Sequence, residues 1–229
     1  MSIRRRQPPT PNPLIVLSSP RSAAAEAYRT LAANLRFGSG PKPVRTILFT
    51  SPGSEEGKSP VLANLAVAAA QGGVRVVLVD ADLRHPRLHE IFDLPNGAGL
   101  ATMLTAGVGD WGLGVGTIQQ TTVDGLRVVT SGPSPESPAD LLGSSRLAEA
   151  LSALEGEADL VAVDSPPVIG VADASLVAPR VDGVVLVVDA RHTRRQDALR
   201  AKAQLQRVNA HLLGVVVNNA DPRDAAYGY

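Results

Sequence analysis

The sequence has no cysteine, no net charge and few aromatic residues. Without cysteine there is no disulfide framework, thiolate zinc site or cysteine nucleophile, which fits a reducing compartment. The 22 Lys and Arg residues balance 22 Asp and Glu residues, a composition that disfavours a dedicated nucleic-acid binder. No apolar run approaches the roughly 20 residues of a membrane span, and the apolar stretch of a secretory signal does not follow Met1–Arg6. We therefore predict a cytoplasmic protein without a membrane span of its own.

Aromatic residues make up 3% of the 229 residues, and two of the three tyrosines, Tyr227 and Tyr229, stand at the C-terminus. A folded core would not place them there. Residues 1–13 combine three arginines with four prolines and show no apolar period, so we expect a disordered basic arm. Residues 14–219 are predicted to form a single domain, followed by a flexible tail, 220–229, that carries the tyrosines.

Short apolar runs after residue 43 predict the strands of one sheet. They span 44–50, 74–80, 126–130, 160–164, 184–189 and 212–218. Several are almost wholly apolar, which suits strands buried on both faces of a parallel sheet. Helical segments lie between them, so the predicted fold is a doubly wound, mostly parallel α/β sheet flanked by helices.

Three helices are marked in the sequence. Ser22 is placed to cap a helix that runs to about Phe37. The segment 58–71 is rich in Ala and Leu. Thr193 and Gln196 match a capping box that would open a helix after the fifth apolar run.

The first predicted strand leads into a segment typical of a phosphate-binding loop. In a strand, loop and helix arrangement, backbone N–H groups surround phosphate oxygens at the helix N-terminus, Lys58 reaches the β/γ-phosphates, and Ser59 contacts Mg²⁺. An ordinary capped turn is the alternative. The residues expected to bind nucleotide in this loop are Gly53, Ser54, Glu55, Glu56, Gly57, Lys58, Ser59 and Pro60.

Two further strands end in acidic residues. Alternation places Asp80 and Asp82 on the same side of the chain, and their repulsion demands a cation, for which Mg²⁺ is the natural choice. A helix N-cap plus a surface acid is the alternative for this pair. Asp164 ends another apolar run, where a carboxylate would hold Mg²⁺ or a water molecule.

These segments together resemble the bacterial tyrosine kinase family over about residues 14–219. The resemblance is carried by the phosphate loop, by the 80–89 run, by Asp164-Ser165-Pro166-Pro167 and by residues 131–133 and 138–142. It implies a P-loop NTPase-like fold, ATP and Mg²⁺ as cofactors, and the family's Walker A, A′ and B motifs. It also implies autophosphorylation of a C-terminal tyrosine cluster, here reduced to Tyr227 and Tyr229, that regulates capsular or exopolysaccharide synthesis and export.

The resemblance also implies residue roles. Lys58 would stabilise charge on the transferring phosphoryl group, while Ser59, Asp82 and Asp164 would hold Mg²⁺ directly or through water. Asp80 would orient or deprotonate the attacking tyrosine hydroxyl. Separately, Asn218 ends the last apolar run, where its amide could bind an adenine edge or simply terminate a strand.

The loop departs from the family at two positions. Glu55 replaces a glycine, and Pro60 replaces a threonine and has no N–H to offer a phosphate. Losing one charge-assisted hydrogen bond costs about 1.5–3 kcal/mol, or roughly tenfold to hundredfold in affinity. We therefore expect weakened ATP binding. In the N-terminal helix, Ala32 interrupts the family's subunit-contact motif, which leaves oligomer assembly open.

The expected partners are a membrane-embedded polysaccharide co-polymerase or activator, which would recruit the protein to the inner face of the cell membrane, and a second subunit. The tail is short, so we expect transfer between subunits. Two other functions remain as alternatives: a catalytically weakened nucleotide-binding regulator of polysaccharide assembly, and a partitioning or division-site ATPase. The latter class carries a lysine where this chain has Gly53.

Overall fold

The computed structural model describes residues 14–37, 44–105 and 117–221. The predicted arm and the tail tyrosines Tyr227 and Tyr229 lie outside the described residues. Among the described residues, no helix combines the length and apolar character needed to cross a membrane.

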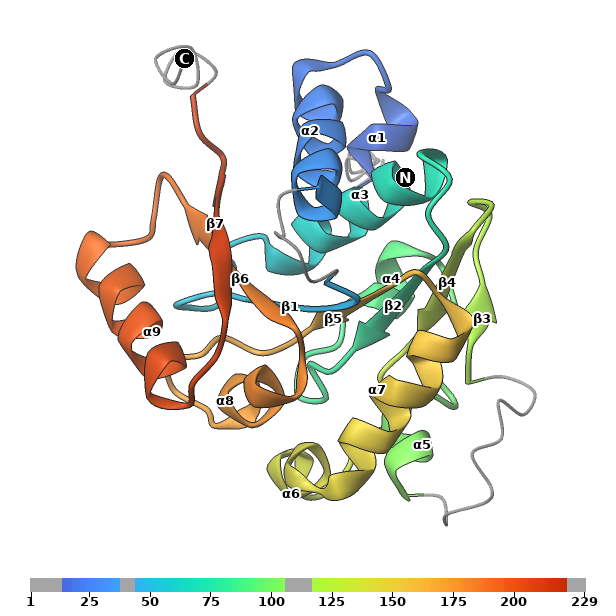
Figure 1. Ribbon diagram of the computed structural model, residues 1–229, viewed down its shortest axis with the longest axis vertical. Coiled ribbons are helices and arrows are strands. Elements are labelled where there is room, and N and C mark those ends of the chain that lie inside the picture. Colours follow the sequence, from blue (N-terminus) through green and yellow to red (C-terminus); the bar gives the residue numbers. More distant parts are fainter. Residues whose placement is uncertain (1–13, 38–43, 106–116, 222–229) are drawn as a thin grey trace, which may run out of the picture.

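The described chain forms a seven-stranded sheet with the order β3-β4-β2-β5-β1-β6-β7 (Figure 1). All neighbouring strands are parallel except β3 and β4. The strands are β1 (Thr46–Thr50), β2 (Val76–Asp80), β3 (Gln119–Gln120), β4 (Leu126–Val129), β5 (Leu160–Asp164), β6 (Gly183–Asp189) and β7 (Leu212–Asn218). All six predicted runs form strands, and the doubly wound α/β fold is confirmed.

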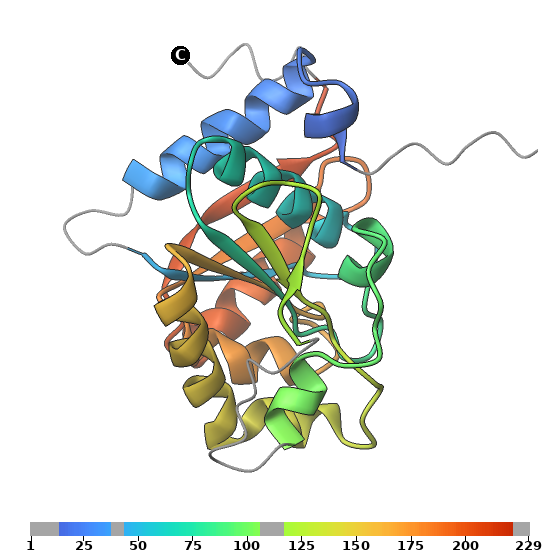
Figure 2. The same ribbon diagram turned by 90° about the vertical axis from the view of Figure 1, so that its right-hand side faces the viewer.

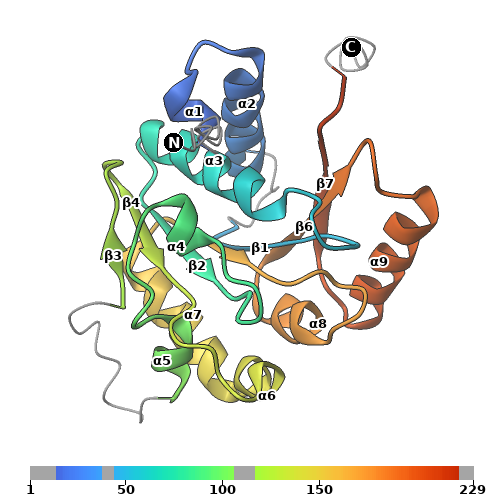
Figure 3. The same ribbon diagram turned by 180° about the vertical axis from the view of Figure 1, so that it is seen from behind.

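Helices cover both faces of the sheet (Figure 2). On one side lie α1 (Ile15–Ser18), α2 (Ala23–Phe37), α3 (Lys58–Gln71) and α4 (Leu88–Ile91). On the other side lie α5 (Leu100–Thr105), α6 (Pro138–Gly143), α7 (Ser145–Glu157), α8 (Asp173–Val177), which continues into a 3₁₀ turn at Ala178–Arg180, and α9 (Arg195–Arg207). Figure 3 shows α3 between α2 and the sheet. Because α3 packs on both, it is apolar on nearly every side.

Helix starts were predicted with mixed success. The hydroxyl of Ser22 accepts the N–H of Ala25 at 3.1 Å, so the predicted cap of α2 is confirmed. The predicted capping box at Thr193 and Gln196 is wrong: α9 begins at Arg195, and no side chain caps it. The hydroxyl of Thr193 is instead bonded to groups outside the helix.

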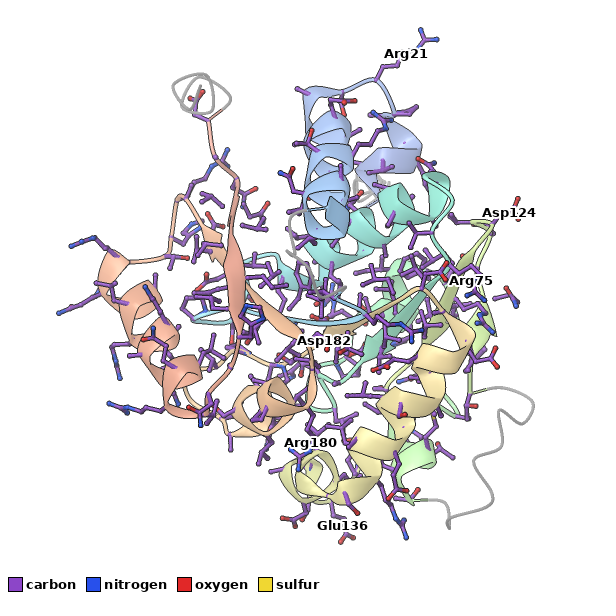
Figure 4. The ribbon with its side chains drawn as sticks, viewed as in Figure 1. Arg21, Arg75, Asp124, Glu136, Arg180 and Asp182 are labelled. Atoms are coloured by element: carbon purple, nitrogen blue, oxygen red, sulfur yellow. The ribbon has the colours of Figure 1, made fainter. Side chains whose placement is uncertain are left out.

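Parallel pairing brings the carboxyl ends of the strands to one edge of the sheet. At the opposite edge, the Asp182 carboxylate accepts the N–H groups of Arg45 and Thr46. This fixes the start of β1 beside β6 (Figure 4). The carboxyl edge therefore remains for the acidic and loop residues that the sequence singled out.

Candidate functional site

The loop from Gly53 to Gly57 joins β1 to α3 at the carboxyl edge of the sheet. Gly57 precedes α3 with φ 80°, a left-handed conformation that suits glycine. Within the described part of the chain, no backbone N–H from Ser54 to Ser59 has a hydrogen-bond acceptor. Six consecutive free donors at a helix N-terminus form an anion-binding arrangement.

The side chain of Lys58 lies among the acidic residues of the site. Its Nζ is 2.5 Å from Asp164 Oδ1 and 3.9 Å from Asp82 Oδ2, and it donates to Ser59 Oγ at 3.2 Å. All four side chains are at least nine-tenths buried. Other charged side chains, such as Arg21, Asp124 and Glu136, point outward (Figure 4). The structure thus brings together Lys58 and the three residues that were expected to hold Mg²⁺: Ser59, Asp82 and Asp164.

Asp80 and Asp164 are register partners at the ends of β2 and β5, and both are fully buried. Burial, with repulsion from Asp164, raises the pKa of Asp80 to about 8. Its carboxylate accepts the N–H groups of Asp82, Arg87 and Leu88 at 2.9–3.2 Å. Three of its roughly four acceptor positions are therefore used, which leaves room for one more partner.

Asp82 is not the surface acid of the alternative interpretation, since only 6% of it is exposed. Its Oδ1 accepts the N–H of His85 at 2.9 Å, while its Oδ2 faces Lys58. Burial raises the pKa of Asp82, and the neighbouring Lys58 opposes that rise. Neither aspartate is a helix N-cap, because Arg87 is the N-cap residue of α4. Asp80 instead reaches the start of α4 from the end of β2 and accepts the N–H groups of Arg87 and Leu88.

The donor set fits Mg²⁺. Asp164 Oδ2 is buried and has no hydrogen-bond partner among the described residues, so one carboxylate oxygen is available to a cation. Asp82 and the Ser59 hydroxyl both lie close to Lys58, as Asp164 does. No group of three acidic or histidine residues in the described chain could hold a metal alone, and Mg²⁺ characteristically uses few protein ligands alongside phosphate and water oxygens.

The two departures in the loop have local consequences. Glu55 has φ 63°, so a left-handed position where glycine is favoured holds a residue with a β-carbon. Its side chain is exposed, whereas Glu56 beside it is buried. Pro60 lies in the first turn of α3, which forms from Lys58 onward in spite of it. Proline is tolerated there because that N–H has no partner within the helix.

Asn218 and Arg84 both have partners within the chain. Asn218 Nδ2 donates to the carbonyl of Glu56 at 3.1 Å, so this amide contacts the phosphate loop. Arg84 forms two hydrogen bonds, of 2.8 and 3.1 Å, with the buried carboxylate of Asp173. Sequence reasoning missed Thr193, which contacts Glu56 at 2.6 Å although the two lie 137 positions apart; no local pattern indicates such a contact.

Asp189, at the end of β6, makes the stability of this region depend on pH. Its pKa falls from 3.8 to about 2, chiefly because it accepts the N–H of Arg191. A folded-state pKa below the unfolded value means that the carboxylate stabilises the fold above about pH 4 and loses this effect as the pH falls towards 2. We expect Asp189→Asn to cost about 1–2 kcal/mol at pH 6 and less at pH 3. Urea unfolding at the two pH values checks this, and a cost independent of pH would contradict it.

The fold and the site define a nucleotide-binding P-loop domain, and comparison with known proteins agrees. The family model of the CobQ/CobB/MinD/ParA nucleotide-binding domain matches residues 47–227. The septum site-determining protein MinD of Pyrococcus horikoshii, solved with Mg-ADP, shares the fold, with a TM-score of 0.62 and 22% identity over 80% of this chain and 75% of that one.

Proteins with higher sequence identity to this chain identify its family more specifically. Tyrosine-protein kinase YwqD of Bacillus subtilis (strain 168) is 36% identical over 217 residues, covering 94% of this chain and 90% of the relative. The crystal structure of the chimerical protein CapA2B2 is 36% identical with a TM-score of 0.83, covering 91% of this chain and 90% of that one. The kinase domain of Escherichia coli tyrosine kinase ETK is 28% identical with a TM-score of 0.84, covering 99% and 86%. The chain belongs to the bacterial tyrosine-protein kinase family.

Proposed function

We propose that the protein is an Mg²⁺- and ATP-dependent tyrosine autokinase that regulates capsular or exopolysaccharide synthesis and export. The observation that carries the proposal is the conjunction at one sheet edge of free loop amides, a buried lysine and three buried carboxylates. Such a site suits a triphosphate with its cation, because its loop amides are free to donate to phosphate oxygens.

The residues of the chain then have distinct proposed roles. The amides from Ser54 to Ser59 bind phosphate oxygens, and Lys58 places its charge beside the transferring group. Ser59, Asp82 and Asp164 would hold Mg²⁺, which when bound neutralises phosphate charge. The tyrosine oxygen bonds to the γ-phosphorus as the bond to the bridging oxygen breaks, giving ADP and phosphotyrosine. Asp80, whose carboxylate keeps one acceptor position free, orients the tyrosine hydroxyl or accepts its proton.

Tyr227 and Tyr229 are the proposed acceptors. β7 runs parallel to β1 through β6, so the chain leaves the sheet at the edge where the phosphate loop lies. An extended tail gains roughly 3.3 Å per residue, a reach that allows its tyrosines to enter the site of a neighbouring subunit. We therefore propose transfer between subunits.

A membrane-embedded polysaccharide co-polymerase is the proposed activator and would hold the protein at the inner face of the membrane.

The subunit contact is proposed to involve α2. There, Glu26 and Arg29 form an exposed ion pair of 2.8 Å, while Ala32 packs against the core. An exposed pair of this kind adds about 0.2–0.5 kcal/mol to the stability of the helix. Because Arg29 also donates to the carbonyl of Pro20, the more exposed Glu26 carboxylate is the charge proposed to contact a partner subunit.

Restoring the usual loop residues tests the nucleotide-binding part of the proposal. We expect Glu55→Gly with Pro60→Thr to raise affinity for a fluorescent ATP analogue roughly tenfold to hundredfold, because one N–H is regained and the left-handed residue becomes glycine. Titration with Mg²⁺ present measures the change. Equal affinities for wild type and double variant would show that these two residues do not weaken binding.

The second candidate is a nucleotide-binding regulator without transferase activity, which Glu55 and Pro60 favour. Both functions share the loop, so binding alone does not separate them. Phosphate incorporation does, since the regulator gains none.

A further inference from the structure

A chain of hydrogen bonds connects the phosphate loop to the end of β6. Glu56 Oε1 accepts the N–H of Gly53 at 2.8 Å, and Glu56 Oε2 accepts the hydroxyl proton of Thr193 at 2.6 Å. The same hydroxyl oxygen accepts the N–H of Asp189 at 2.8 Å. Only 7% of Glu56 is exposed. A buried carboxylate inside the loop therefore has its charge balanced by donors on both sides.

A second connection reaches the loop from β7. Asn218 Nδ2 donates to the carbonyl of Glu56 at 3.1 Å and lies directly against Gly57, where an added β-carbon would come within 2.1 Å of it. The next residue, Asn219, has φ 56° and donates to Asp189 Oδ2 at 2.8 Å. The loop is thus bound to both strand ends, and those strand ends are bound to each other.

We propose that Glu56, Thr193 and Asn218 are positioning residues that hold the phosphate loop in its anion-binding conformation before a nucleotide arrives. The proposal rests on nucleotide binding at this loop. Residues 53–57 lie outside any helix or strand, so without external contacts they would have to be ordered when the phosphates bind. A loop that is already ordered avoids this entropic penalty.

The same contacts explain how a glutamate is tolerated beside phosphates. The Glu56 carboxylate points to Gly53 and Thr193, and its two acceptor oxygens are both engaged. These three residues make no contact with Lys58, Asp82 or Asp164 among the hydrogen bonds and ion pairs of the described chain. Replacing Glu56, Thr193 or Asn218 should therefore weaken the binding of ATP. It should leave Lys58, Asp82 and Asp164 in their positions beside the transferring phosphoryl group.

Thr193→Val tests the proposal, because valine keeps the branched shape and removes the hydroxyl. We expect affinity for the fluorescent ATP analogue to fall about tenfold, as for the loss of one charge-assisted hydrogen bond. The KM for ATP should rise by a similar factor, with kcat within about twofold. Thr193→Ser, which retains the hydroxyl, should restore wild-type values.

Thr121→Val is the matched control. The hydroxyl of Thr121 likewise accepts one hydrogen bond, from the N–H of Val123, and donates one, to the carbonyl of Leu126. It lies at the turn between β3 and β4, at the opposite end of the strand order from β6 and β7. This variant loses an equivalent hydroxyl and should bind the ATP analogue as wild type does. A fall in affinity equal to that of Thr193→Val would assign both effects to general destabilisation and overturn the proposal.

Backbone order parameters of residues 54–59, measured by NMR without nucleotide, separate this proposal from the proposed function. Thr193→Val should lower them, from values near 0.85 towards those of a flexible segment, and Thr121→Val should not. If wild type fails to bind ATP, the proposed function fails, and the order parameters still report on the loop. Unchanged order parameters in Thr193→Val, or unchanged affinity where wild type binds ATP, would overturn the positioning role.

Discussion

Lys58→Met is expected to lower phosphoryl transfer by at least about 10²–10³-fold, the usual loss when a donor aimed at developing charge is removed. Methionine has a similar length and fills the same buried space, so the effect isolates the ammonium group. Lys58 is the only lysine in contact with Asp82 and Asp164 among the described residues. Radioactive or mass-based measurement of phosphate incorporation checks the prediction, and a variant that keeps a tenth of wild-type activity would contradict it.

The same substitution should change how the nucleotide-free protein responds to Mg²⁺. In wild type the ammonium group of Lys58 neutralises Asp164 at 2.5 Å and faces Asp82 at 3.9 Å. Without this ammonium group, the buried carboxylates of Asp82 and Asp164 have no neighbouring positive charge. A divalent ion that binds them in the folded state would then stabilise the fold by mass action. We expect Mg²⁺ alone to raise the Tm of Lys58→Met but not that of wild type. Lys202→Met, on the exposed side of α9, is the control and should respond as wild type does.

Tyr227→Phe with Tyr229→Phe is expected to remove all incorporated phosphate. The reason is the placement of the third tyrosine: Tyr28 lies in α2 and packs against the core, and burial raises the pKa of its hydroxyl. It is therefore not presented to a kinase site. Tyr28→Phe is the matched control, since it removes one hydroxyl and should leave phosphate incorporation unchanged. Phosphate that persists in the double variant would place the acceptor elsewhere in the chain.

The sheet was predictable because its strands are contiguous apolar runs. β1 and β2 are buried on both faces and have polar residues only at their ends, Thr46, Thr50 and Asp80. The helix at Lys58–Gln71 begins and ends where composition places it. β3 was missed because Gln119–Gln120 is two residues long and has no apolar pattern. Its place beside β4 depends on pairing between segments that sequence periodicity does not report.

The site was predictable where it is local in sequence and unpredictable where it is not. Phosphate loop and strand-end aspartates are short motifs whose position follows from parallel pairing. Thr193 could not be placed because its sequence neighbourhood fits a helix cap equally well, and only the packing of β6 beside β1 brings it to Glu56. Similarly, alternation gives the side on which Asp80 lies but not that it holds the start of α4.

The most direct test of the central claim is the intact mass of the purified protein after incubation with Mg²⁺ and ATP, alone and with the cytoplasmic segment of a membrane activator. A tyrosine autokinase predicts added phosphoryl groups in wild type, none in Lys58→Met, and none in the variant that lacks Tyr227 and Tyr229. An unchanged wild-type mass in the presence of the activator, while the ATP analogue still binds, would contradict the account and leave a nucleotide-binding regulator.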